Sequence, residues 1–411
     1  MVKHKNYPNG LNLIVCEGGA ISCSFSIMIG TGSINETDKT NGISHYIEHM
    51  NFKGSKKYSA YEISEIMDSH GANYNAYTSV ENTCFYAQSI VESLEKTFSV
   101  MAESAFNSIY LDSEAEKEKG VIVEEINMSE DSPDDVCYDL MMKAFYGEDG
   151  YGRTILGSES NVNSFTKRDV KKYLKDYYVA SNVVISFAGN ITLDKADYLV
   201  NKYVMPLLND SPKKSTPKHN VKCLKQNLVK IKDIEQVHIA ISFPTYCYGD
   251  KDKVISEVSN GILGGGMSSR LFRKVREELG LAYSVYSFAS RYKTAGSLNI
   301  CAGVNSEEYK SAYQAVLEVI NNLKKNGVYD YEVEKVKTGL KASTVYAQEK
   351  PLSLSQFYAS HFLRTGKIYD FNERLLQIES VTVDKVNDEF NKLNNVNKST
   401  AVVGKSVEKL S

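Results

Sequence analysis

The sequence predicts an α+β fold made of two homologous α/β halves in one chain, each a mostly antiparallel sheet covered by helices on one side. Residues 22–29 and 236–243 are apolar, β-branched runs, and each leads into a polar loop and then a helical pattern. Residues 170–189 and 386–404 share a second order, which is helix, turn, apolar strand and glycine. Because each of these two successions of elements occurs twice in one chain, the sequence indicates a duplicated α+β unit.

A polar segment separates the two halves. Residues 209–220 are rich in Asn, Ser and Lys and hold two of the seven prolines, a composition typical of exposed linkers. We therefore expect domains at 1–208 and 221–411 with a linker at 209–220. The length of 411 residues agrees with this division, because each part is long enough to bury its own core.

The elements of the first half follow from local patterns. Ser59 and Glu62 have the spacing of a capping box, which opens a helix that ends at Gly71. Apolar and β-branched runs predict strands at 11–16, 22–29, 73–79, 83–89 and 182–188. Further helices are expected at 41–51, at 91–110, from Asp112 to before Asp131, and at 170–178.

Composition and charge exclude several classes of protein. The net charge is −3, which gives no support to a nucleic-acid partner. No apolar run approaches the roughly 18 residues that span a membrane, and the first residues lack the apolar core of a signal peptide. The seven cysteines are scattered without a Cys-x-x-Cys pair, which favours reduced thiols. We therefore expect a cytoplasmic protein with no membrane partner.

The segment His45-Tyr46-Ile47-Glu48-His49 carries the clearest chemical signal. On a helix, residues four apart lie on one face, so the two imidazoles can bind one zinc ion. Glu48 projects near the same face and can take a proton from a zinc-bound water. His-x-x-Glu-His is also the inverted zincin pattern. The competing interpretation is an amphipathic helix with two capped or partly exposed histidines.

A zinc site with two histidines needs a third protein ligand and an open position for water. The helix that begins at Asp112 is rich in glutamates, most of which suit a solvated face. Glu118 and Glu125 are seven residues apart and share one face, and the apolar residues 121–123 between them indicate that part of the helix is buried. A buried carboxylate needs a cation or a donor, so a glutamate of this helix could complete the site.

A second concentrated stretch runs over residues 264–283. It lacks the Gly-Lys-Ser/Thr spacing of a phosphate-binding loop. Arg270, Arg273 and Arg276 are three of only eight arginines, whereas the chain has 40 lysines. Arginine in a lysine-rich chain indicates a fork that meets a carboxylate or carbonyl in fixed geometry. A structural ion pair between helices is the alternative for each arginine.

Four segments together resemble the insulinase-like (pitrilysin-type) zinc peptidases, and most closely the single-chain bacterial proteases related to the mitochondrial processing peptidase. These segments are 42–54, 75–79, 118–125 and 264–283, in the family's order and over nearly the whole chain. The resemblance implies that 1–208 is the zinc-binding catalytic half. It also implies that 221–411 is a degenerate second half that contributes substrate contacts.

By this resemblance His45 and His49 are ligands of one zinc ion per chain. The third ligand is Glu125, which lies 76 residues after His49 and seven after Glu118. The adjacent Glu124 is the competitor for that role. Glu118 is then a supporting residue that orients one of the two histidines.

The resemblance also implies the remaining roles. Glu48 is the general base, and Arg276 and Tyr283 reach the substrate from the second half. Tyr283, together with the zinc, could stabilise the oxyanion. An exposed edge strand offers unpaired backbone groups to an extended peptide, and its residues here are Asn75, Ala76, Tyr77 and Thr78.

The function implied is a zinc metalloendopeptidase that hydrolyses extended or unfolded peptides inside a closed chamber. One zinc half and one degenerate half supply only half of such a chamber, so a homodimer or a heterodimer with a related chain is implied. Two alternatives remain open. The chain could be a non-catalytic partner subunit of the same fold, or a binding module with a structural zinc site, although structural sites are usually rich in cysteine.

Overall fold

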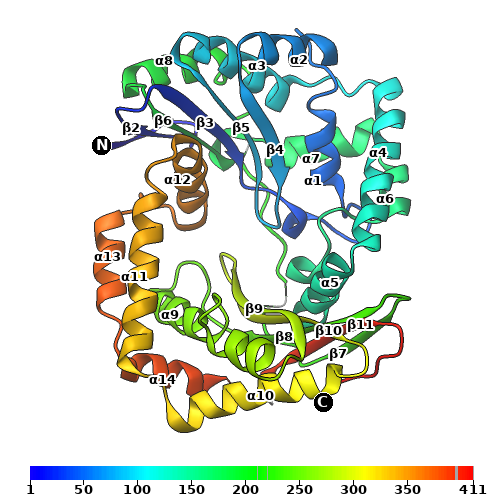
Figure 1. Ribbon diagram of the computed structural model, residues 1–411. Helices are drawn as coiled ribbons and strands as arrows, with labels where there is room; N and C mark the ends of the chain where they lie inside the picture. Colours follow the sequence, from blue (N-terminus) through cyan, green and yellow to red (C-terminus); the bar gives the residue numbers. More distant parts are fainter. Residues whose placement is uncertain (211, 220, 394–396, 411) are drawn as a thin grey trace. The chain divides into compact units, whose positions relative to one another are not determined.

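The computed structural model describes residues 1–210, 212–219, 221–393 and 397–410. They form two compact units, each assembled from three stretches of the chain (Figure 1). The first unit comprises Met1–Asn127, Thr154–Lys218 and Tyr346–Tyr369. The second comprises Met128–Arg153, His219–Val345 and Asp370–Ser411. The sequence predicts two contiguous domains, whereas these compact units are discontinuous.

The first unit is built on a six-stranded sheet with the order β1-β2-β6-β3-β5-β4. Its neighbouring strands are antiparallel except for β2 and β6, which run parallel. The strands are β1 Val2–Asn6, β2 Asn12–Glu17, β3 Ser22–Ile29, β4 Asn73–Thr78, β5 Thr83–Ile90 and β6 Val183–Gly189.

The second unit is built on a five-stranded sheet with the order β7-β11-β8-β10-β9. It repeats the arrangement β2-β6-β3-β5-β4 of the first sheet, including the single parallel pair, which here is β7 and β11. The fold is therefore α+β with two similar, mostly antiparallel sheets, as predicted. The strands are β7 Asn227–Ile231, β8 Gln236–Pro244, β9 Ala282–Arg291, β10 Gly296–Asn305 and β11 Ser399–Gly404.

Helices cover one face of each sheet. In the first unit, alternate residues of β3 such as Phe25 and Ile27 enter a core shared with helices from the same unit. These helices are α1 Ile43–Met50, α2 Ala60–Ser69, α3 Leu94–Asn107, α4 Asp112–Asp131, α6 Glu159–Ser164, α7 Lys167–Tyr177 and α8 Leu193–Tyr203. In the second unit, Ile239 and Ile241 of β8 enter a separate core. Its helices are α9 Lys253–Leu263, α10 Tyr309–Asn326, α11 Asp330–Tyr346, α13 Phe371–Glu379 and α14 Val383–Lys392.

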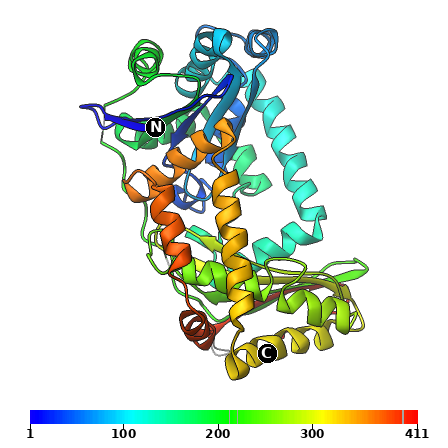
Figure 2. The ribbon, with the colours of Figure 1, turned by 60° about the vertical axis from the view of Figure 1, so that its left-hand side comes forward.

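One further helix lies against the other face of each sheet, and the two helices are exchanged between the halves of the sequence. Helix α12 (Pro351–Thr365) packs on β3 and β6 (Figures 1 and 2), where the hydroxyl groups of Ser26 and Ser355 lie 2.8 Å apart. Helix α5 (Pro133–Tyr146) packs on β11 and β8. This exchange is why each compact unit is made of separate stretches.

Several predicted elements agree with the structure within a few residues. The capping box is present, since Ser59 Oγ accepts from the backbone of Glu62 and Glu62 accepts from the backbone of Ser59. Strand β1 was not predicted, and its lysines and histidine suit an edge strand. In the predicted linker, residues 211 and 220 lie outside the described residues, and 212–218 contain no helix or strand.

None of the helices among the described residues is both long enough and apolar enough to cross a bilayer.

Candidate metal centre

Helix α1 carries His45, Glu48 and His49 on one face, because residues three and four apart lie above one another on a helix. Most of this short helix is buried, including His45, whereas Glu48 and His49 are half-buried. His45 is 7% exposed. The Nε2 atoms of the two histidines lie 3.2 Å apart. Both imidazoles therefore present a ring nitrogen to the same point in space.

Helix α4 lies beside α1 and supplies a carboxylate to that point (Figure 1). Glu125 Oε2 is 3.6 Å from His45 Nε2 and 3.4 Å from His49 Nε2. Within the described part of the chain, these three residues are the one group of three or more potential metal ligands whose donor atoms lie within 4.8 Å of each other. Glu124, the adjacent competitor, is exposed and outside the group.

The three donor atoms fit a zinc ion. Tetrahedral ligands about 2.0–2.1 Å from zinc are separated from each other by roughly 3.3–3.4 Å, and the separations here are 3.2, 3.4 and 3.6 Å. Two imidazole nitrogens and one carboxylate oxygen also match the donor set of catalytic zinc sites, which keep a fourth position open. The site could therefore hold zinc without rearrangement.

Glu118 orients His49 from behind. The imidazole donates from Nδ1 to Glu118 Oε1 at 2.8 Å, so Nε2 is the nitrogen that would offer its lone pair to a metal ion. The other oxygen of Glu118 pairs with Lys53 Nζ at 2.8 Å. Burial opposes ionisation, but the bonds from His49 and Lys53 hold the pKa of Glu118 below its usual value. Of the two histidines left open in the sequence prediction, Glu118 contacts His49.

The two histidines differ in their electrostatic surroundings. Burial, with the nearby His49, lowers the pKa of His45 to about 4, so its ring is neutral. Burial also disfavours the charge on His49, but hydrogen bonds to Glu118 and Glu125 outweigh it and raise its pKa to about 9. A metal cation would thus replace a proton on His49.

Glu48 lies beside this group and is held by the edge strand. Thr78 Oγ1 donates to Glu48 Oε2 at 2.6 Å. Burial raises the pKa of the Glu48 carboxyl, while the Thr78 hydrogen bond and the charge of His49 lower it. A carboxylate with a raised pKa is a better proton acceptor at neutral pH, which suits a general base.

The predicted substrate strand is β4, and it forms an edge of the first sheet. It carries Asn75, Ala76, Tyr77 and Thr78 and pairs with β5. The amide of Ala76 donates to the side chain of Asn75 at 2.8 Å, so a peptide that added to this edge would compete with that carboxamide. Thr78 has the additional contact with Glu48, which the sequence did not reveal.

Arg276 and Tyr283 belong to the second unit and lie close to each other there. Arg276 is on a π-helix, Phe272–Glu278, and its guanidinium is 5.8 Å from the ring centroid of Tyr283 and 4.7 Å from that of Phe272. Tyr283 is 76% exposed and has no partner across a β-bulge between β9 and β10. π-helices and bulges often occur at functional sites.

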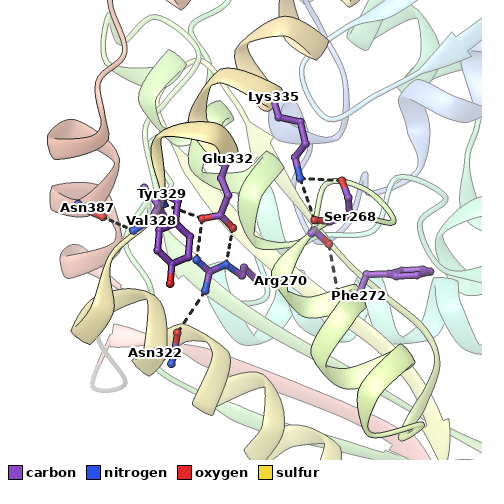
Figure 3. A network of polar contacts seen from close by, with 10 residues as sticks. Ser268, Arg270, Phe272, Asn322, Val328, Tyr329, Glu332, Lys335 and Asn387 are labelled. Atoms are coloured by element: carbon purple, nitrogen blue, oxygen red, sulfur yellow. Dashed lines mark hydrogen bonds and ion pairs between the residues drawn. The ribbon is translucent and has the colours of Figure 1, made fainter.

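Arg270 takes the structural role left open as the alternative. Its Nε and Nη2 atoms donate to the two oxygens of Glu332 at 2.6 and 2.8 Å, and Figure 3 shows the two side chains facing each other. In the same network, Lys335 donates to the backbone and side chain of Ser268. These contacts attach the glycine-rich segment to α11, so the fork of Arg270 meets a carboxylate of its own unit.

The second unit carries different residues at the positions equivalent to the metal group. Helices α4 and α11 each begin with an aspartate. In both cases this aspartate lies 21 residues before the proline that begins the exchanged helix, α5 or α12. By this alignment Glu118 corresponds to Val336 and Glu125 to Ser343. Glu118 contacts His49 in the first unit. In the second unit Gly261 closely approaches Val336, the residue that corresponds to Glu118, so we align Gly261 with His49.

Four residues earlier on α9, Glu257 corresponds to His45. Its carboxylate forms an ion pair with Arg374 and lies 3.8 Å from Arg291. Glu257 is the single acidic residue among these aligned positions of the second unit, and arginine side chains pair with it. That the second half is degenerate stays a prediction.

Two unpredicted residues hold the ends of α1. The carboxylate of Glu36 accepts hydrogen bonds at its beginning, and Asn51, at its end, accepts one from Tyr110 Oη at 2.6 Å. Both residues flank the His-x-x-Glu-His segment in the sequence. Polar residues beside an apolar helix were the one feature of the sequence that could have pointed to Glu36 and Asn51. Their roles could not be predicted, because Glu36 acts through a loop conformation and Asn51 through a residue distant in the chain.

The fold and this site define a two-unit α+β protein with a candidate zinc centre of the peptidase type. Residues 17–159 match the family model described as insulinase (peptidase family M16), and residues 164–340 match the model described as the peptidase M16 inactive domain. An uncharacterized zinc protease of Bacillus subtilis, YmxG, is 36% identical over 388 residues, which are 94% of this chain and 94% of that protein. The chain belongs to the insulinase family, peptidase family M16.

Other relatives agree. An uncharacterized zinc protease of Streptomyces coelicolor is 30% identical and covers 94% of this chain and 85% of its own length. The crystal structure of a protease from Helicobacter pylori superposes with a TM-score of 0.90 at 23% identity, over 98% of this chain and 99% of that one. A peptidase M16 inactive domain from Pseudomonas fluorescens gives a TM-score of 0.92 at 18% identity, over 100% and 99%. These two structures show the shared fold.

Proposed function

We propose that this chain is a zinc-dependent endopeptidase that hydrolyses peptide bonds in extended or unfolded peptides. The observation that carries the proposal is the convergence of His45, His49 and Glu125 on one point, with the Glu48 carboxylate beside them. The names of the relatives as zinc proteases support it. We propose one zinc ion per chain, because the equivalent residues of the second unit include a single acidic group paired with arginine.

The chemistry would divide between the metal and the protein. Zinc held by His45, His49 and Glu125 would act as a Lewis acid and lower the pKa of water to about 7. Glu48 would take the proton of the attacking water and deliver it to the leaving amine. Thr78 would keep the Glu48 carboxylate turned toward the scissile bond.

Substrate would bind as an added strand along β4. The backbone of Asn75, Ala76, Tyr77 and Thr78 would pair with an extended peptide, which gives affinity with little side-chain preference. Arg276 and Tyr283 would contact the same peptide from the second unit, and the Tyr283 hydroxyl would help to stabilise the oxyanion. Folded proteins do not present a free strand, so unfolded segments are the expected substrates.

We further propose that the working form is a homodimer or a heterodimer with a related chain in the cytoplasm. A chain with one metal group and one unit without it would supply half of an enclosing chamber. The second candidate function is a non-catalytic partner subunit, which the match of residues 164–340 to an inactive-domain model favours.

The test compares wild type with Glu48→Gln on a mixed set of unfolded peptides, with zinc quantified in both. We expect one zinc per chain in both proteins and a fall in the cleavage rate on the order of 10²–10⁴-fold in the variant, because the proton acceptor is lost. Glu65→Gln, an exposed glutamate of α2, is the matched control and should cleave at the wild-type rate. Equal cleavage by wild type and Glu48→Gln would refute the assigned base, and cleavage by neither, with zinc bound, would favour the partner-subunit role.

A further inference from the structure

The beginning of α1 is capped by a carboxylate from outside the helix. The N-cap residue, Gly42, has no side chain to accept hydrogen bonds from the first turn, and its φ of +98° is the left-handed conformation that glycine favours. Glu36 supplies the missing acceptor. Its Oε2 accepts from the backbone of Gly42 at 2.8 Å, and its Oε1 accepts from the backbone of Ser44 at 2.9 Å.

Side-chain donors complete the environment of this carboxylate. Ser44 Oγ donates to Glu36 Oε1 at 2.6 Å, and Asn41 Nδ2 donates to Oε2 at 2.9 Å. Glu36 is 1% exposed. Burial raises the pKa of its carboxyl, whereas these donors lower it. The negative charge also lies at the positive end of the helix dipole, where it is favourable.

The same donors connect the cap to the rest of the first unit. Ser44 Oγ lies 2.7 Å from Tyr173 Oη on α7, and that hydroxyl lies 2.6 Å from Oγ1 of Thr31, which follows β3 in the chain. Asn41 Nδ2 also donates to the backbone of Thr154 at 2.8 Å. The first turn of α1 is therefore fixed relative to the sheet and to α7, not only to its own loop.

The location of the cap matters for the metal group. Ser44 directly precedes His45, and His49 follows one turn later, so a shift of the first turn would move both imidazoles together. Glu125 stands on a different helix and would not move with them. Donor atoms 3.2–3.6 Å apart leave little tolerance for such a shift.

We propose that Glu36 is a positioning residue for the metal site: its buried carboxylate holds the first turn of α1 so that His45 and His49 face the carboxylate of α4. The inference rests on the proposed zinc site. It assigns no contact between Glu36 and the metal. Its effect is transmitted through Ser44 and the backbone of the first turn.

The test is metal affinity in Glu36→Gln, measured for Zn²⁺ by competition with a chromophoric chelator on folded, metal-free protein. The amide keeps the shape but offers one acceptor atom where two are needed, so we expect zinc affinity to fall on the order of 10–100-fold. The d–d absorption bands of the Co²⁺-substituted protein should also change, because they report ligand geometry. Glu103→Gln is the matched control, since Glu103 is also 1% exposed in the first unit but contacts Asn107 and Lys57.

The outcomes separate the two proposals. Weaker Zn²⁺ binding and altered Co²⁺ bands in Glu36→Gln, with Glu103→Gln like wild type, support the inference. Wild-type affinity in Glu36→Gln, or equal weakening in Glu103→Gln, overturns it while the zinc site stands. Failure of the wild type to bind Zn²⁺ overturns both. If Glu36→Gln does not fold, Ser44→Ala, which keeps the backbone bond, should show a smaller weakening, and unchanged affinity there overturns the inference.

Discussion

At the scale of single residues, the Glu118 carboxylate joins two cations. It accepts from His49 at 2.8 Å and pairs with Lys53 at 2.8 Å, and it is 4% exposed. A carboxylate that accepts from the second nitrogen of a metal-binding histidine fixes the ring and raises its basicity. The orientation of His49 therefore depends on a residue that would not touch the metal.

Removing that charge should weaken zinc binding. For Glu118→Gln we expect the dissociation constant for zinc to rise on the order of 10–100-fold, because His49 becomes a weaker and less ordered ligand. Chelator competition on folded protein measures it. Glu65→Gln, exposed on α2, serves as the control and should bind as wild type does. An unchanged constant in Glu118→Gln would mean that the Glu118 contact has no influence on the metal.

Zinc binding can also decide whether Glu125 or the adjacent Glu124 is the third ligand. Glu125→Gln should lose zinc at concentrations that saturate the wild type, because one of three donors is replaced by a weaker one. Glu124→Gln should bind normally, since Glu124 is exposed and outside the group. Zinc quantified after dialysis decides the matter, and loss of zinc in Glu124→Gln alone would reverse the assignment.

At this scale the sequence pointed to the three residues that the structure groups together, but not to most of the residues that hold them in place. The i, i+4 spacing of His45 and His49 is a local property of a helix, and it predicted their common face. The cap by Glu36 depends on a loop conformation, and the contact of Thr78 with Glu48 depends on strand pairing. Such long-range contacts leave no periodic pattern in a single sequence.

At the scale of elements, Glu95 connects two helices of the first unit. On α3, it accepts from Lys195, Lys202 and Tyr203, all on α8. Hydrogen bonds from Lys195 and Lys202, the largest causes, lower the pKa of Glu95 to about 2. α3 and α8 are thus joined at the surface by a charge cluster as well as by core packing.

This cluster makes stability depend on acidity. The pKa of Glu95 is lower in the folded protein than in the unfolded chain, so its contribution is complete above about pH 4.5 and is lost as pH falls toward 2. Glu95→Gln should therefore reduce the melting temperature at pH 6 by a few degrees at most, since the group is partly exposed. The difference from wild type should vanish near pH 2. A constant difference over that pH range would contradict the prediction.

The arginines of residues 270–276 were predicted in part. The excess of arginine at 270–276 correctly indicated a fork in fixed geometry, and Arg270 meets Glu332. Composition alone did not tell an internal carboxylate from a substrate. Arg276 points to the aromatic rings of Phe272 and Tyr283, and its role toward a peptide stays a prediction.

At the scale of the whole molecule, the exchange of α5 and α12 joins the two halves of the sequence. Pro133 and Pro351 mark where these helices begin, which a sequence can show. Which sheet each helix covers is a matter of tertiary packing, so the contiguous domains expected from the linker at 209–220 did not anticipate the exchange. The repeated sheet order, by contrast, follows from the repeated pattern of strands and helices.

The exchange predicts that the first half does not fold well alone. A fragment of residues 1–218 lacks α12, so the face of β3 and β6 that carries Ser26 would be uncovered. We expect it to bind a hydrophobic dye such as ANS and to unfold without a cooperative transition. The control is the full chain cut at a protease site inserted in residues 212–218, which keeps α12 and should unfold cooperatively. Cooperative unfolding of the fragment alone, without dye binding, would contradict the prediction.

The exchanged helix also sets the order of events on the ribosome. The last strand of the first sheet ends at Gly189, but the helix that covers its second face ends at Thr365. At about 5–20 residues per second, translation leaves that face without its cover for roughly nine to thirty-five seconds. A nascent chain in this interval exposes part of a sheet, so chaperones that recognise growing polypeptides have a defined window in which to act.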